Sequence, residues 1–216
     1  MNRSSFLVVA AVLAAAAPAG AAPRKPPQGG RLSVAARPTP RTFAQGTVVS
    51  GKLTGQNNGG QPVTLSEDPF PYGGGFLSFA RGTTRANGNF AFPLIFPATN
   101  RNYRVTVGTQ QAFTGVRVRM RVSFAVGDST PNRGQRVGFT GFVAPKHDGR
   151  TVLIQRRSAT GSWGTVLRTL LKASTGNRSH YGTSLVIRRT GTYRVRAGSD
   201  GDHLTGTSRT RTLSVG

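Results

Sequence analysis

The chain has 216 residues, no cysteine, and 29 Lys and Arg against 6 Asp and Glu, which gives a formal net charge of +23. This length allows one or two domains. The lack of cysteine excludes disulfides, so each domain must be held by its core alone, which takes more than ~70–80 residues. After the first 22 residues no segment approaches ~18 consecutive apolar residues, so we expect no membrane span in the mature chain.

The positive charge is almost entirely guanidinium, because only four of the 29 cations are Lys. Guanidinium groups suit carboxylates and phosphates, which they bind through paired N–H donors. A chain this basic should attract polyanions such as nucleic acid, anionic wall polymers or acidic lipid head groups. The competing interpretation is that a GC-rich genome favours Arg, Ala and Gly codons and that the charge only keeps the protein soluble.

Residues 1–22 have the pattern of a secretory signal peptide. Arg3 supplies a positive start, residues 6–17 form an apolar core, and residues 19–21, Ala-Gly-Ala, form a small-residue cleavage site. Residues 23–30, PRKPPQGG, follow as a Pro/Gly linker that we expect to lack fixed structure. These segments predict a protein that is secreted or associated with the cell surface.

From residue 31 onward, Val, Thr, Phe and Tyr alternate with polar residues, and Gly, Pro, Asn and Asp recur at short intervals. This pattern predicts short β-strands joined by turns. The expected fold class is therefore all-β, built as a sandwich or barrel. Only residues 167–171 fit a turn of helix as well as they fit a strand.

The tripeptide Tyr-Arg-Val occurs at residues 103–105 and again at 193–195, 90 residues later. Four other landmarks recur in the same order at nearly the same spacing: 31–34 with 121–124, 50–51 with 140–141, 60–65 with 149–154, and Asn87 with Asn177. A period this long indicates tandem domains, because the units of a solenoid are shorter. We expect a divergent domain 1 over residues 31–120 and domain 2 over residues 121–216.

The second copy is predicted to contain seven strands, near residues 121–126, 135–143, 151–157, 164–170, 183–188, 192–197 and 207–215. This strand number in about 90 residues is typical of an immunoglobulin-like β-sandwich. In such sandwiches a Tyr near the start of the sixth strand packs in the core, and its hydroxyl bonds to backbone near the preceding corner. Tyr103 and Tyr193 occupy this position, so we expect structural roles for both.

Residues 113–126 cross the boundary between the two copies without an intervening loop. Apolar side chains alternate there with Arg117, Arg119 and Arg121. Because the side chains of a strand point alternately to its two faces, the apolar set should be buried and the arginines exposed. We therefore expect a short, stiff junction near residues 120–122.

Three motifs of the second copy have a familiar pattern: GRTVLIQ at 149–155, GSW at 161–163 and YRVR at 193–196. Together they resemble the Ig-like repeats of secreted and surface proteins of actinobacteria. The first copy diverges, because it lacks the Trp and carries SEDPFPYGGGF at 66–76. The resemblance implies a β-sandwich and an extracellular location. It implies no particular ligand, because such modules serve as spacers, adhesion units and substrate-binding appendages.

Motifs of enzymatic chemistry are missing from the sequence, which has no G-x-S-x-G, H-E-x-x-H or P-loop. The adjacent Glu67 and Asp68 would point to opposite faces of a strand and so could not act as a pair. We therefore expect that the protein is not an enzyme.

One group of acids and histidines is a candidate metal site. Residues 146–149, KHDG, and 199–203, SDGDH, should form loops at the same end of the second sandwich. The two loops would bring together His147, Asp148, Asp200, Asp202 and His203. Oxygen ligands could hold Ca²⁺ and the histidine pair could hold Zn²⁺. Otherwise these Asp and Gly residues are ordinary turn formers, and the protein needs no cofactor.

Aromatic side chains mark a second group of candidates: Phe70, Tyr72 and Phe76 flank three glycines, and Trp163 stands in the GSW turn. Exposed rings of this kind could stack on sugars or bases. Alternatively, the rings cover an open sheet face or the rim of the core. The aromatic and metal candidates together define the alternative function, a carbohydrate-binding or metal-stabilised adhesion module.

Arginines on the last strands form the third group of candidates: Arg104, Arg117 and Arg119 in the first copy, and Arg194, Arg196, Arg209 and Arg211 in the second. Facing outward, they would make a basic stripe on each domain. Such stripes would bind an anionic cell-envelope polymer or a surface protein, and nucleic acid only non-specifically. The other interpretation is a solvated sheet face whose charge discourages edge pairing. The leading prediction is a secreted, non-enzymatic Ig-like binding or scaffolding protein of the cell envelope with charge-driven affinity for anionic polymers.

Overall fold

The structure, a computed structural model, describes residues 25–216, so the predicted signal peptide lies outside the described residues. Every secondary-structure element assigned in this range is a β-strand, which confirms the all-β fold class. Within residues 25–216 there is no helix with the length and apolar character needed to cross a membrane.

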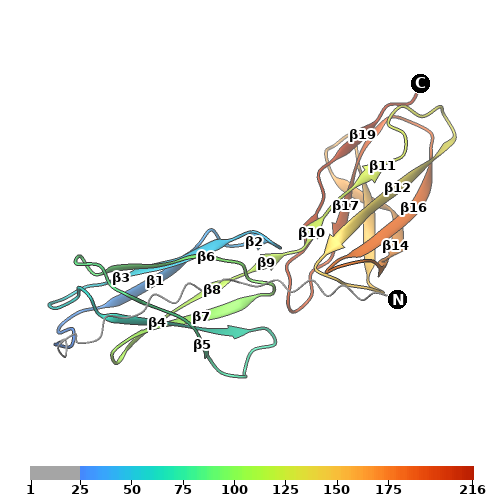
Figure 1. Cartoon of the computed structure of the whole chain (residues 1–216). Helices are drawn as coiled ribbons and strands as arrows, with labels where there is room; N and C mark the ends of the chain where they lie inside the picture. The colour runs from blue at the N-terminus through green and yellow to red at the C-terminus, as the bar shows by residue number, and fades with distance from the viewer. Residues whose placement is uncertain (1–24) are drawn as a thin grey trace, which may run out of the picture.

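The described chain forms two halves that meet end to end (Figure 1). The N-terminal half, residues 25–119, contains β1 (Leu32–Arg37), β2 (Arg41–Thr42), β3 (Thr47–Leu53), β4 (Pro62–Pro69), β5 (Leu77–Thr83), β6 (Asn89–Ile95), β7 (Arg101–Val107), β8 (Gln110–Val116) and β9 (Val118–Arg119). The C-terminal half, residues 120–216, contains β10 (Arg121–Val122), β11 (Ala125–Val126), β12 (Gln135–Ala144), β13 (Thr151–Arg157), β14 (Trp163–Leu170), β15 (Lys172–Ala173), β16 (Ser179–Ile187), β17 (Gly191–Ala197), β18 (Gly206–Thr207) and β19 (Arg211–Leu213).

The main strand order is the same in the two halves, apart from β15, which adds a strand beside β16 in the C-terminal half. The N-terminal half has one sheet in the order β1-β3-β6 and another in the order β5-β4-β7-β8. In the C-terminal half β10 and β11 together take the place of β1 beside β12, which pairs with β16. The second sheet there runs β14-β13-β17, and both β18 and β19 pair with the far side of β17. The two Tyr-Arg-Val motifs therefore lie on strands, β7 and β17, that hold matching places.

Each half has its own hydrophobic core, to which both of its main sheets contribute. Alternate residues point inward, so Tyr103 and Val105 on β7 and Tyr193 and Val195 on β17 are all buried. Burial of apolar surface contributes about 25 cal/mol per Å². In a chain without cysteine this term replaces the covalent support that many secreted domains obtain from disulfides.

Most predicted strands of the second copy agree with the observed ones, but three differ. β16 begins at Ser179 instead of residue 183. The predicted strand at 207–215 is divided into β18 and β19, and the one at 121–126 into β10 and β11. The latter interruption has a local cause, because the Ser123 hydroxyl accepts a hydrogen bond from the Phe142 N–H at 2.8 Å in place of a strand carbonyl.

The predicted linker is not free of structure from residue 25 onward. Gln28 forms an isolated antiparallel bridge with Gln56. The side-chain amide of Gln61 donates a hydrogen bond to the Lys25 carbonyl at 3.0 Å. The expectation of an unstructured segment is therefore wrong for these residues, since they pair with the loop between β3 and β4.

Glycines at matching positions of β3 and β12 let the first strand of each half lie unusually close beside them. A Cβ atom on Gly141 would lie 2.3 Å from the Ser123 carbonyl oxygen and 2.5 Å from the Tyr181 hydroxyl oxygen. A Cβ atom on Gly51 would lie 2.0 Å from the Ser33 carbonyl oxygen. No carbon can approach an oxygen so closely without displacing it. The recurrence of Gly in the 90-residue repeat is therefore a packing requirement.

Replacing Gly141 by Ala should lower the free energy of unfolding by about 1–3 kcal/mol, because the added methyl group must push a neighbouring strand away. Gly138→Ala is the matched control on the same strand, since a Cβ atom there meets no atom within 4 Å. Urea denaturation of both variants measures the difference. Equal losses in the two variants would contradict the close crossing.

The tyrosines of the two motifs are buried as expected, but one predicted hydrogen bond is wrong. Among the described residues the Tyr103 hydroxyl is buried and has no hydrogen-bond partner. The bond from a tyrosine hydroxyl to backbone is made by Tyr181 of β16, which donates to the Ser123 carbonyl at 2.6 Å. Tyr181 thus reaches past Gly141 on β12 and holds the first strand of the half, a link between strands that are not neighbours.

The two hydroxyls should respond differently to removal. Tyr181→Phe should lower the free energy of unfolding by about 0.5–1.5 kcal/mol, because a formed hydrogen bond is lost. Tyr103→Phe should leave it unchanged or raise it, because the deleted hydroxyl is buried without a partner. Urea midpoints of the two variants decide, and a larger loss for Tyr103→Phe would contradict this assignment.

Candidate functional site

The junction between the halves is formed by residues 116–122 and by a loop of the C-terminal half. Val116, Val118 and Met120 are buried, while the arginines between them are exposed, as the alternation in the sequence predicts. The loop at residues 198–204, between β17 and β18, lies beside this stretch. The Leu204 N–H donates to the Val118 carbonyl at 2.7 Å, and the Met120 N–H donates to the Leu204 carbonyl at 3.1 Å.

Asn100 connects the same loop to the other side of the N-terminal half. It lies just before β7 and is 5% exposed. Its backbone N–H donates to the Asp202 carbonyl at 2.8 Å. Its side-chain Nδ2 donates to the Gly201 carbonyl at 3.2 Å, and its Oδ1 accepts from the Val118 N–H at 2.8 Å. One side chain therefore joins the loop to the segment that covalently links the halves.

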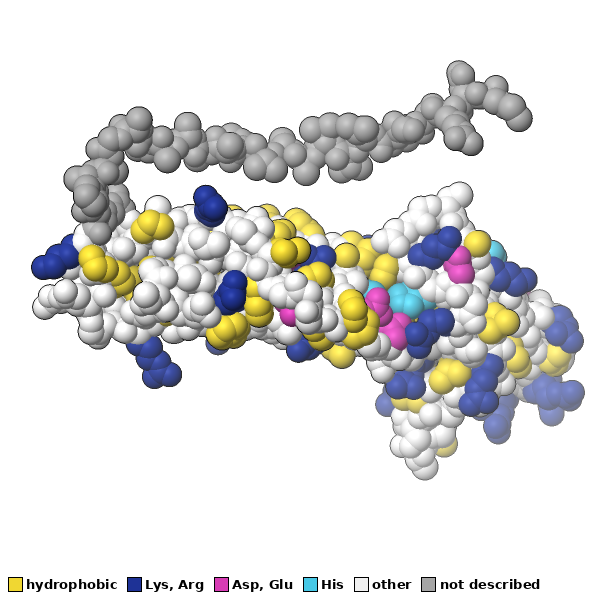
Figure 2. Space-filling view, turned by 90° about the horizontal axis from the view of Figure 1, so that it is seen from below, with side chains coloured by type: hydrophobic (Ala, Val, Ile, Leu, Met, Phe, Trp, Pro, Cys, Tyr) yellow, Lys and Arg dark blue, Asp and Glu magenta, His cyan; other side chains and the backbone are white. Residues whose placement is uncertain are grey.

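Four titratable residues gather on this loop and the neighbouring one. His147, Asp200, Asp202 and His203 each offer one ligand atom, and these atoms lie within 4.8 Å of one another. Figure 2 shows acidic side chains and histidines together where the two halves meet. Four of the five residues named from the sequence as metal candidates are thus brought together.

Each imidazole of the group has one ring nitrogen bonded to a backbone carbonyl. His147 Nδ1 lies 2.7 Å from the Pro145 carbonyl oxygen. His203 Nε2 lies 2.8 Å from the Ala98 carbonyl oxygen, which belongs to the N-terminal half. A carbonyl oxygen can only accept, so these nitrogens carry the protons. The opposite nitrogens, His147 Nε2 and His203 Nδ1, face the carboxylates.

Asp200 organises the loop from which it projects. Its Oδ1 accepts a hydrogen bond from the backbone N–H of His203 at 2.7 Å. Its Oδ2 accepts from Arg150 Nη1 at 3.0 Å and lies 2.9 Å from His147 Nε2. The carboxylate is therefore held by the turn on one side and by the neighbouring loop on the other.

Asp202 completes the group, since its Oδ1 lies 3.1 Å from His203 Nδ1. Burial acts to raise the pKa of the Asp202 carboxyl. Hydrogen bonding with Asp200 and the charge of His203 outweigh burial and hold this pKa below its ordinary value. These contacts therefore favour the ionised form of Asp202.

Asp148, the fifth predicted metal residue, is placed elsewhere. Its carboxylate accepts a hydrogen bond from the buried Ser179 hydroxyl and pairs with Lys146 Nζ at 3.0 Å. These contacts lower the pKa of the Asp148 carboxyl, the hydroxyl of Ser179 most of all. The structure therefore places Asp148 apart from the other four residues, because its carboxylate is held by Ser179 at the start of β16.

The aromatic candidates lie mostly against protein. The Phe70 ring lies next to Gly201, where a Cβ atom would come within 2.4 Å of the ring, so it packs at the junction. Trp163 is covered by the Arg194 guanidinium, 4.1 Å from the ring centroid. Phe76 is likewise covered by Arg104, at 4.8 Å.

Tyr72 is the remaining aromatic candidate, and it packs edge-on against Phe70 with ring centroids 5.6 Å apart. Phe70 and Tyr72 meet edge-on, and Phe76 and Trp163 are each covered by an arginine, so the four rings do not form one flat platform on which a sugar could stack. Two of them serve the same purpose in the two halves, since each supports the Arg of a Tyr-Arg-Val motif.

The arginines predicted as a stripe in the N-terminal half have different surroundings. Arg104 lies over an aromatic ring. Arg117 Nη1 is 3.4 Å from both the Arg101 carbonyl oxygen and Asn102 Oδ1. Arg119 is exposed on β9. Of these three arginines, Arg104 and Arg117 contact other side chains or carbonyls of the N-terminal half, and Arg119 is the one exposed to solvent without such a contact among the described residues.

In the C-terminal half the four predicted arginines do not share one face. Arg194 and Arg196 point outward from β17, because the residues between and beside them are buried. Arg211 on β19 lies opposite the inward-facing Tyr193, and directly opposed residues share a face. Its Nε donates a hydrogen bond to the carbonyl of Phe124, between β10 and β11, at 3.5 Å. Arg209 is exposed between β18 and β19. The predicted four-membered stripe is therefore wrong.

An outward row does exist on this sheet, with a member that the sequence did not indicate. Leu153 on β13 lies opposite Arg196 on β17 and also opposite Arg168 on β14. Arg168 and Arg196 therefore flank one residue on the outer face, with Arg194 two positions along β17. We call these three residues the arginine row. Only the pairing of β13 with β14 reveals Arg168.

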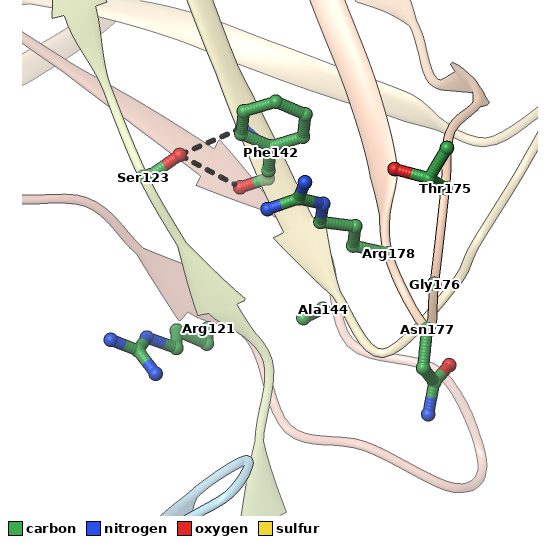
Figure 3. A pocket seen from close by; sticks show the side chains of 8 residues that line it. All are labelled: Arg121, Ser123, Phe142, Ala144, Thr175, Gly176, Asn177 and Arg178. Atoms are coloured by element: carbon green, nitrogen blue, oxygen red, sulfur yellow. Dashed lines mark hydrogen bonds between the residues drawn. The ribbon is translucent and has the colours of Figure 1, made fainter. Parts of the chain in front are cut away.

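A separate basic hollow lies on the other sheet. Its volume is about 550 Å³, and Arg121 and Arg178 line it together with uncharged residues. Figure 3 shows the Arg178 side chain beside Phe142, and its guanidinium lies 4.3 Å from the ring centroid. The hollow adds a second cationic surface to the C-terminal half.

Comparison with known proteins identifies no family for this chain. No protein-family model matches the chain, and no curated protein matches it. One similar solved structure is a tetra-tandem repeat from the extending region of a large adhesion protein, with 12% identity and a TM-score of 0.34. The similarity covers 87% of this chain and 49% of that one, so this chain spans about half its length. It carries no argument about function.

Replacing Asn100 by Ala should loosen the two halves, because it removes one hydrogen bond to the loop and leaves the buried Val118 N–H without an acceptor. We expect the rotational correlation times of both halves, measured by ¹⁵N relaxation, to become shorter, because each half then tumbles more freely. Asn102→Ala is the control, since the Asn102 side chain accepts a hydrogen bond from the exposed Arg117 of the same half. Unchanged correlation times in the Asn100 variant would contradict this role of the junction.

Proposed function

We propose that this protein is a non-enzymatic scaffolding or adhesion protein, secreted or held at the cell surface, that binds anionic polymers of the cell envelope through its charge. In this proposal the chain presents two tandem Ig-like sandwiches as one stiff unit. The single observation that carries it is the arginine row on the outer face of the C-terminal half.

Strand order supports the Ig-like assignment of both halves. In an Ig-like sandwich the first, second and fifth strands form one sheet, and the third, sixth and seventh form the other. The orders β1-β3-β6 and β4-β7-β8 fit this arrangement, with β5 added beside β4. The C-terminal half repeats the order. Ig-like sandwiches commonly bind ligands through their loops or sheet faces and do not catalyse reactions themselves.

The junction supports a scaffolding role. Backbone hydrogen bonds join the loop at 198–204 to both Asn100 and the segment from Val118 to Met120. Two independent attachments resist rotation about the linking strand in a way that one covalent connection does not. A stiff two-unit rod separates its ends by a constant distance, which suits a spacer or an adhesion unit.

The arginine row supports affinity for a polyanion. Residues 121–216 hold sixteen Lys and Arg against four Asp and no Glu. Within the described residues the cations with a carboxylate partner are Arg101, Lys146 and Arg150, so the arginine row has none. Burial, and next the charge of Arg196, lower the pKa of Arg194. Like charges held this close repel one another, and an anionic polymer would relieve the repulsion.

Sedimentation of the purified protein with isolated cell envelope tests the proposal. Bound protein should fall steeply over a few hundred millimolar NaCl, because counterions compete with the arginines. Absence of binding at low salt would overturn the proposed affinity and leave only the spacer role.

A matched pair of variants tests whether the arginine row itself binds. Arg168→Gln with Arg196→Gln removes two charges from the row, and Arg81→Gln with Arg85→Gln removes two exposed charges from the N-terminal half. Only the first pair should shift the curve to lower salt. If both pairs weaken binding equally, the charge acts diffusely and the arginine row is not the binding surface.

A further inference from the structure

We infer that His147, Asp200, Asp202 and His203 form a binding site for a divalent transition-metal ion, Zn²⁺ by their ligand set, which closes the junction between the halves. The inference concerns a cation and does not depend on the anionic polymer proposed above. It rests on the orientation of the imidazoles, the electrostatics of the group and its geometry.

Both imidazoles are oriented as metal ligands are. Protein ligands of this type commonly donate the second ring N–H to a carbonyl or carboxylate, which fixes the tautomer and aims the other nitrogen. His147 does so toward the Pro145 carbonyl and His203 toward the Ala98 carbonyl. The two rings stand nearly perpendicular, at 77°, with centroids 5.1 Å apart. Two lone pairs are thereby directed into one space.

The buried His203 nitrogen is the strongest sign that something is bound. His203 is 1% exposed, and its Nδ1 atom is buried without a hydrogen bond. Nδ1 lies 3.1 Å from Asp202 Oδ1 and 3.7 Å from Asp200 Oδ1. Unprotonated imidazole nitrogens and carboxylate oxygens are all acceptors, so they repel one another unless a proton or a metal cation lies between them. Arg150 offsets part of the charge of Asp200 from outside the group.

The ligand atoms are gathered nearly as closely as a tetrahedral ion requires. With bonds of about 2.0–2.1 Å, two ligands of tetrahedral Zn²⁺ are roughly 3.3 Å apart. His147 Nε2 lies 2.9 Å from Asp200 Oδ2, and His203 Nδ1 lies 3.1 Å from Asp202 Oδ1 and 3.7 Å from Asp200 Oδ1. The four ligand atoms lie within 4.8 Å of one another, so the side chains would draw together around the ion. Ca²⁺ takes six to eight oxygen ligands and rarely uses imidazole. Two imidazoles and two carboxylates therefore favour Zn²⁺ over Ca²⁺.

The position of the group gives the ion a structural consequence. Asp200, Asp202 and His203 belong to the loop that contacts the N-terminal half, while His147 belongs to the loop between β12 and β13. An ion bound by all four would tie these loops together. Since His203 also bonds to Ala98 across the junction, the ion would stabilise the contact between the halves.

Titration calorimetry of the purified protein, prepared without a histidine tag, tests binding directly. We expect one Zn²⁺ per chain, little response to Ca²⁺, and a rise in melting temperature with Zn²⁺ concentration. Co²⁺ should give the visible absorption bands of tetrahedral coordination. No heat with Zn²⁺ and no such Co²⁺ bands would overturn the inference and mean that protons on the imidazoles alone balance the carboxylates.

Variants of the partly exposed ligands locate the site. His147→Gln and Asp202→Asn should weaken Zn²⁺ binding by ~100-fold or more. Loss of a residue that only hydrogen-bonds to a metal ligand already weakens binding by about 10–100-fold, and loss of a ligand itself should cost at least as much. His180→Gln and Asp148→Asn are matched controls, because these residues lie outside the group, and both should bind as the unmodified protein does. Equal weakening by a control would place the ion elsewhere. Circular dichroism spectra of all four variants check that each is folded.

The junction provides an independent readout. Zn²⁺ should lengthen the rotational correlation times of the two halves in the Asn100→Ala variant, because the ion replaces part of the lost contact. If Zn²⁺ binds but leaves these times unchanged, the site is real and its role in the junction is wrong. Neither result depends on retention by cell envelope, so failure of one proposal is distinguishable from failure of the other.

Discussion

The loop at residues 198–204 hydrogen-bonds both to the N-terminal half and to the segment that links the two halves, and the relation of the halves depends on this contact. Asn100 meets it on one side, and the segment from Val118 to Met120 meets it on the other. Most of these bonds use backbone groups, whose geometry is set by the turn that Asp200 stabilises. A backbone contact of this kind is directional, because each buried N–H and carbonyl must find its partner. The loop therefore positions the halves as well as joining them.

The same loop also carries negative charge, which is the rarer sign in this chain. The chain has only six acidic residues, and Asp148, Asp200 and Asp202 lie in the two loops at the junction. This leaves the outer sheet of the C-terminal half with the arginine row and no acid to balance it. A strongly basic protein with its carboxylates concentrated at one internal contact has two electrostatic regions. We propose that one binds a cation at the junction and that the other binds anions from outside.

Features that depend on neighbouring residues were predictable, and features that depend on strand pairing were not. The alternation of apolar and polar residues indicated the strands, and the 90-residue repeat indicated matching strand orders, because both patterns are written along the chain. Arg168 was missed because it joins the arginine row only through Leu153 on the strand between. Tyr181 was missed because its hydroxyl bonds across an intervening strand, to Ser123. Asp148 was misplaced because the Ser179 hydroxyl captures it.

The sequence by itself determined the all-β class, the repeated architecture and the alternation of apolar residues with arginines at 113–126. The spacing of apolar residues and the residue types of turns can both be seen directly along the chain. It also indicated that two loops rich in Asp and His should lie at one end. Only the tertiary structure decided that His203 turns toward Ala98 of the other half, that Arg211 and Arg196 face opposite sides, and that Phe70 packs on Gly201. The physical reason is that a side chain's partner is fixed by register and by the approach of distant segments, and neither is encoded in the spacing of residues along one strand.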